Sequence, residues 1–187
     1  MLVEQFYLKI LMLIGFFILA GLVDYLVKKN EANRWKEYLF ILCFAGLISL
    51  VGLVYDQIIV TISPEYFAVA KALGYEDLRF LTAMMGLKAG FVAGCIMSGS
   101  FLMATKSKHV FPLFGWLKFI IPFTLSMLFI GPVAGLLFYW NGANPYSLPD
   151  GQNMRLLMVW CTHGALYIGT IIGTGISCYK IAKQPII

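Results

Sequence analysis

The residues with the most chemical potential fall into two stretches, one near the middle of the chain and one near its end. The first contains Tyr55-Asp56-Gln57 and, a little further on, Ser63-Pro64-Glu65-Tyr66-Phe67. The second contains Arg155, His163 and Tyr167. Only 12% of the residues are charged and 60% are hydrophobic. An ionised group close to hydrocarbon costs several kcal/mol unless it has a partner or water. These groups therefore require partners.

Their residue types suggest ion pairing, proton transfer or weak metal binding. A pair between Arg155 and either Asp56 or Glu65 would offset the cost of burial, and would let His163 bind a metal ion or move a proton. A metal site needs three or four matched ligands, and only His163, Asp56 and Glu65 are weak candidates. We therefore predict no metal site and assign no cofactor.

We expect these side chains to converge between the second and fifth membrane helices, in a polar pocket that opens outward. The predicted pocket residues are Asp56, Gln57, Glu65, Tyr66, Arg155, His163 and Tyr167. At helical spacing, His163 also begins a polar stripe that continues through Tyr167, Thr170 and Thr174. A purely structural interpretation stays open: the tyrosines would form an interfacial aromatic belt, and Asp56 with Arg155 would hold two helices together.

The elements that must position these residues are membrane helices. The mean hydropathy is +0.84, and the apolar residues occur in blocks of about twenty, the length needed to cross a hydrocarbon core of ~30 Å. We predict an all-α protein: one integral membrane bundle covering residues 1–187 with five transmembrane helices, at about 6–27, 38–60, 80–104, 118–140 and 154–179. The chain leaves no room for a separate soluble domain.

Charge placement predicts the topology. The formal net charge is +5, and the basic residues lie in short segments beside the apolar blocks, at 28–36, 106–118 and 180–183. The positive-inside rule puts these segments in the cytoplasm, the N-terminus outside and the C-terminus inside. We therefore expect a multi-pass protein of a cell inner membrane, with the lipid bilayer and not nucleic acid as its partner.

Small residues indicate where helices pack closely. Gly86, Gly90 and Gly94 recur at four-residue spacing, which places them on one helical face. Gly169 and Gly173 repeat this spacing in the last span. Such a strip lets another backbone approach, either from the same chain or from a second copy.

The two chemical stretches also resemble an uncharacterised family of small bacterial inner-membrane proteins. Members share a His-Asp-Gln segment followed by Pro-Glu-Tyr-Phe at a helix end, and a last helix with Arg and then His-Asn-x-Ser-Tyr-x-Gly. Here the segments read Tyr55-Asp56-Gln57 with Ser63-Pro64-Glu65-Tyr66-Phe67, and Arg155 with His163-Gly164-Ala165-Leu166-Tyr167-Ile168-Gly169. Tyr55 and Gly164 depart from the pattern, and the absent second histidine weakens a shared metal site. The resemblance covers about residues 45–180 and supplies no reaction.

Three functional hypotheses follow. The leading one is a non-enzymatic membrane subunit or oligomeric scaffold, either a homo-oligomer or part of a larger membrane complex. The alternative is a small transporter, channel or proton-coupled membrane factor that uses Asp56, Glu65, Arg155 and His163. A metal-dependent membrane enzyme is the second alternative. No phosphate loop, nucleophile with a base at defined spacing, or CxxC motif supports an enzyme, so the sequence favours a protein without catalytic activity.

Overall fold

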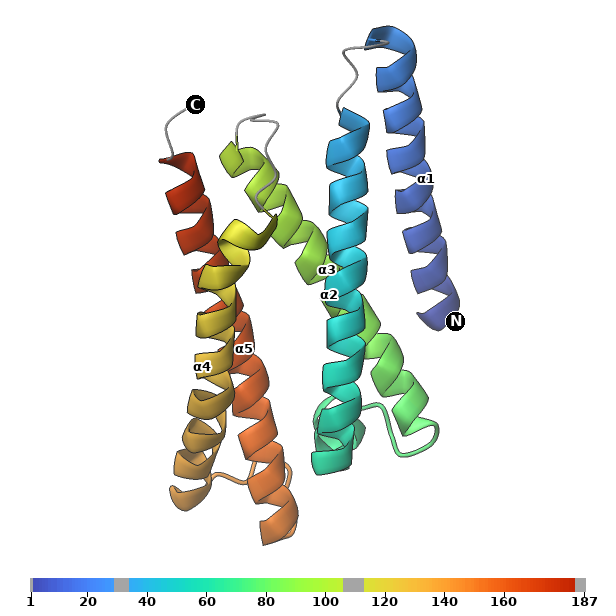
Figure 1. The fold of residues 1–187 in the computed structure, drawn as a ribbon. Coiled ribbons are helices and arrows are strands. Elements are labelled where there is room, and N and C mark those ends of the chain that lie inside the picture. Colours follow the sequence, from blue (N-terminus) through green and yellow to red (C-terminus); the bar gives the residue numbers. More distant parts are fainter. Residues whose placement is uncertain (1, 29–33, 106–112, 184–187) are drawn as a thin grey trace. The chain divides into compact units, whose positions relative to one another are not determined.

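The computed structural model describes residues 2–28, 34–105 and 113–183, and within these ranges the regular structure is entirely helical (Figure 1). Five long α-helices and one short π-helix follow one another along the chain. They are α1 (Leu2–Lys28), α2 (Arg34–Ile62), η2 (Tyr66–Ala70), α3 (Leu78–Thr105), α4 (Leu113–Trp140) and α5 (Asp150–Ala182). The predicted all-α class is confirmed.

Four helices are long and apolar enough to cross a membrane: Trp35–Ile62, Leu78–Thr105, Ile120–Trp140 and Asp150–Ala182. Within α1 the apolar part that qualifies, Ile14–Val27, is shorter. The chain thus has the helices of a multi-pass membrane protein, while the fifth span and the N-outside, C-inside orientation stay predictions.

Most helices extend beyond the apolar blocks that predicted them. For example, α5 begins at Asp150 and ends at Ala182, whereas the apolar block covers only 154–179. A helix satisfies its own backbone hydrogen bonds, so it continues into the polar interface until a turn residue stops it. Residues 71–77, which the sequence did not separate from the next span, form a tight connection before α3.

The described chain forms two compact units. One comprises Met1–Tyr55 and Ala83–Leu102, and the other comprises Asp56–Thr82 and Met103–Ile187. Both α2 and α3 contribute to each unit, whereas α4 and α5 belong to the second.

In the first unit, α2 and α3 approach at their glycines. A Cβ added at Gly90 would meet the carbonyl oxygen of Ile48 and, at 2.7 Å, the Cα of Ser49. One at Gly94 would lie 2.6 Å from the Cα of Ala45. The Ser49 hydroxyl donates a hydrogen bond of 2.7 Å to the Leu87 carbonyl across the same contact. The strip of Gly86, Gly90 and Gly94 is buried, and its partner is α2 of the same chain.

In the second unit, α4 and α5 run side by side, joined by the 141–149 connection (Figure 1). Gly131 of α4 lies against Thr162, and a Cβ at Gly135 would lie 2.6 Å from the Leu157 carbonyl oxygen. From the other helix, a Cβ at Gly169 would lie 2.6 Å from the Met127 Cγ. The sequence singled out Gly169 for packing, but missed both glycines on α4.

Candidate functional site: a buried polar cluster between α2, η2 and α5

The connection after α2 is shaped by one proline. The Ser63 amide still donates to the Ile59 carbonyl at 2.9 Å, but Pro64 has no N–H and interrupts the helical hydrogen bonding. The chain then forms η2, a π-helix of five residues. The amide of Gly74 returns to the Ala68 carbonyl at 3.1 Å, and its φ of +74° suits glycine. Short π-helices frequently occur at functional sites.

At the centre of the site, His163 of α5 is paired with Asp56 of α2. The His163 Nε2 lies 3.2 Å from the Asp56 Oδ1, and the His163 Nδ1 lies 3.2 Å from the Val159 carbonyl oxygen. The two side chains are only 10% and 8% exposed. A backbone carbonyl only accepts, so Nδ1 must carry a proton to make its bond. One further proton then lies between Nε2 and Oδ1, and the two side chains hold it as a unit.

Aromatic rings from η2 cover this pair. The Tyr66 ring lies 4.6 Å from the imidazole, centroid to centroid and inclined by 31°. The Phe67 ring meets the imidazole edge-on at 6.1 Å. Both aromatic residues are almost completely buried, at 2% and 1% exposure. Because these rings exclude water, they strengthen the electrostatic interaction beneath them.

A second ion pair attaches η2 to α5. An Arg155 guanidinium nitrogen donates to the Glu65 Oε1 at 2.8 Å, and the Ser63 hydroxyl donates to the Glu65 Oε2 at 3.1 Å. The Glu65 side chain is 5% exposed, whereas that of Arg155 is 44% exposed. Both oxygens of the buried carboxylate therefore have a donor, and the guanidinium extends toward the surface.

The start of α3 is attached separately to the last turns of α2. The Gln57 amide donates to the Arg79 carbonyl at 2.9 Å, and the Arg79 guanidinium donates to the Thr61 hydroxyl at 3.2 Å. Gln57 thus serves a different contact from that of its neighbour Asp56.

Beyond His163, the polar stripe on α5 is only partly buried. Tyr167 is 55% exposed, whereas Thr174 is 9% exposed. The Thr174 hydroxyl oxygen is buried and has no hydrogen-bond partner within the described ranges. Buried hydroxyls are usually bonded to protein or water, so this atom marks a place for an ordered water molecule.

The predicted site residues thus divide into several contacts instead of lining one pocket. Asp56, His163 and Tyr66 come together, as do Glu65 and Arg155, while Gln57 and Tyr167 contact neither pair through a hydrogen bond described above. We expected the carboxylate pairing with Arg155 to leave His163 for a metal ion, but the imidazole is engaged by Asp56. Among the residues that the structure describes, no group of three His, Cys, Asp or Glu side chains is placed to hold a metal ion.

Two further members of the cluster were missed by sequence reasoning, Ser63 and Phe67. Both lie within the Ser63-Pro64-Glu65-Tyr66-Phe67 stretch that the sequence did single out. A π-helix would have been needed to place Phe67 against the imidazole, and no sequence pattern identifies one.

Comparison with known protein families, curated proteins and solved structures gave no match. The argument for function therefore rests on the geometry of the cluster.

Proposed function

We propose that this protein is a small proton-conducting membrane factor in which His163 and Asp56 hold the transferred proton. The proposal is carried by one observation. An imidazole is buried between two acceptors, a carboxylate and a backbone carbonyl, in the last helix of a multi-span protein. Ionisable residues within membrane helices are costly and mark ion or proton paths. Imidazole is the side chain whose ordinary titration falls between pH 5 and 8.

The route inward follows the polar stripe of α5. Thr174 lies about 16 Å beyond His163 along the helix axis at 1.5 Å per residue. Tyr167 and Thr170 lie between them at helical spacing, and the gaps suit single bridging water molecules. The buried Thr174 hydroxyl supports water at the inner end of this route. In the opposite direction, η2 separates the pair from the surface, with Glu65 and Arg155 fixing it in place.

The close packing of α2 on α3 bears on the leading hypothesis from the sequence, an oligomeric scaffold. The strip of Gly86, Gly90 and Gly94 motivated that hypothesis, yet it is covered by α2 of the same chain. The strip is thus explained without a second copy. An oligomer or a larger complex stays a prediction, and the metal-dependent enzyme has no ligand set to support it.

Proton flux into liposomes tests the proposal. We would reconstitute the protein into vesicles that enclose a pH-sensitive dye and apply a potassium diffusion potential with valinomycin. The wild-type protein is expected to accelerate acidification over that of empty vesicles. Asp56→Asn and His163→Gln should each return the rate to that of empty vesicles, because each removes one of the two groups that share the proton.

Asp150→Asn is the matched control. It makes the same carboxylate-to-amide change at the exposed first turn of α5, away from the pair. This variant should conduct like the wild type. Wild-type vesicles as tight as empty ones would reject the proposal and favour the scaffold.

A further inference from the structure

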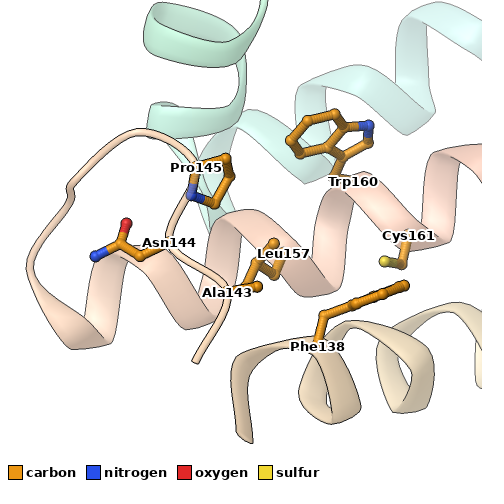
Figure 2. Close-up of a pocket in the computed structure, with 7 residues that line it drawn as sticks. All are labelled: Phe138, Ala143, Asn144, Pro145, Leu157, Trp160 and Cys161. Carbon is orange, nitrogen blue, oxygen red and sulfur yellow. The ribbon is translucent and has the colours of Figure 1, made fainter. Parts of the chain in front are cut away.

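A second site lies where α4, α5 and the connection between them meet. This pocket has a volume of about 510 Å³. Phe138 of α4 forms one wall, and Leu157, Trp160 and Cys161 of α5 form the opposite side (Figure 2). The connection closes one end with Pro145 and its neighbours. The volume lies within the usual range for small-molecule sites.

The walls are apolar and carry no charged side chain. The one amide at the pocket, Asn144, is bonded within its own loop: its nitrogen donates to the Leu148 carbonyl, and its oxygen accepts from the Leu148 amide, both at 2.9 Å. No lining side chain is therefore placed to select a polar ligand. A void between apolar groups loses dispersion contacts unless an apolar group fills it.

The pocket lies at the depth of lipid chains. Trp140, at the end of α4, is 72% exposed, and the Tyr146 ring lies 5.9 Å from that of Trp160. Exposed tryptophan and tyrosine at helix ends mark the membrane interface. From Asp150, Leu157 lies about 10 Å and Cys161 about 16 Å along α5. These depths suit the upper part of a hydrocarbon half-layer of ~15 Å.

We propose that this pocket binds one acyl chain of a membrane phospholipid, independently of any proton conduction. Phe138 and Trp160 are 56% and 43% exposed, so the mouth opens on the outer side of the two apolar helices, where lipid surrounds a membrane span. The uncharged walls hold the chain and leave the headgroup at the level of Trp140 and Tyr146. A lipid held there exchanges more slowly than its neighbours in the bilayer.

Fluorescence quenching by a brominated phosphatidylcholine tests this proposal in mixed detergent micelles. The reporter is Trp160 in a variant that carries Trp35→Phe, Trp116→Phe and Trp140→Phe. The matched control adds Trp160→Phe and Ile171→Trp, which moves the indole to a position on α5 that is 70% exposed. Trp160 should be half-quenched at about a tenfold lower mole fraction of bromolipid, the ratio given by ~1.4 kcal/mol of preferential binding.

Filling the pocket should remove this preference. Cys161→Phe in the Trp160 reporter is expected to shift the curve to that of the control, whereas Cys178→Phe on the same helix should leave it unchanged. Identical curves for the two original reporters would overturn the proposal. A Trp160 that stays unquenched in a protein that is dimeric by light scattering would also overturn it, and would assign the pocket to a second copy.

Discussion

At the residue scale, the cluster uses two ion pairs in different environments. His163 and Asp56 are both buried, and aromatic rings cover them, whereas the Arg155 partner of Glu65 is 44% exposed. A half-exposed ion pair gains little from Coulomb attraction alone. Its value here comes from the buried carboxylate, which would lack a donor on one oxygen if the guanidinium were removed.

Replacing Arg155 with alanine should therefore destabilise the protein. The expected loss is about 1–3 kcal/mol in the free energy of unfolding, the cost of leaving a buried acceptor without its donor. Unfolding in mixed micelles of mild detergent and dodecyl sulfate would measure it. Arg155→Lys should recover part of the loss, since it keeps the charge but cannot reproduce the planar donor. Equal losses in both variants would contradict this account.

At the element scale, helix pairing depends on glycines whose partners are backbone atoms. A backbone cannot change rotamer to make room, so an added methyl group must separate the helices. This distinguishes Gly90 and Gly94 from Gly99 on the same helix, where an added Cβ would meet nothing within 4 Å.

We expect Gly90→Ala to destabilise the first unit by about 1–3 kcal/mol through overpacking. Gly99→Ala should instead be neutral or stabilise the protein by ~0.5–1 kcal/mol, because alanine is the better helix former. The same unfolding assay compares the two variants. If Gly90→Ala changed only the oligomeric state and left the stability of the protein intact, the strip would serve a second copy and not α2.

At the scale of the whole molecule, the remaining question is orientation. The positive-inside rule places the 141–149 connection outside and the C-terminal end of α5 inside. With this orientation, η2 lies on the outer side of the membrane and the polar stripe of α5 leads toward the cytoplasm.

Cysteine labelling in intact cells tests this topology. The four native cysteines are free thiols, and they would first be replaced by alanine. A membrane-impermeant maleimide should then label Ser147→Cys in intact cells, and Lys183→Cys only after the cells are permeabilised. Both positions are exposed, so burial does not complicate the comparison. The reverse labelling pattern would invert the topology and the direction of the proposed proton route.

The sequence alone determined the all-helical class, the membrane setting and most of the chemical residues. Apolar blocks of fixed length and the cost of ionised groups near lipid are local properties that a sequence shows directly. Tertiary structure decided the pairings: Glu65 and not Asp56 with Arg155, Asp56 with His163, and α2 as the partner of the Gly90 strip. These choices depend on helix rotation and on the π-helical turn after Pro64, and neither is encoded in hydropathy or spacing. The apolar pocket beside Trp160 also exists only when α4, α5 and their connection come together.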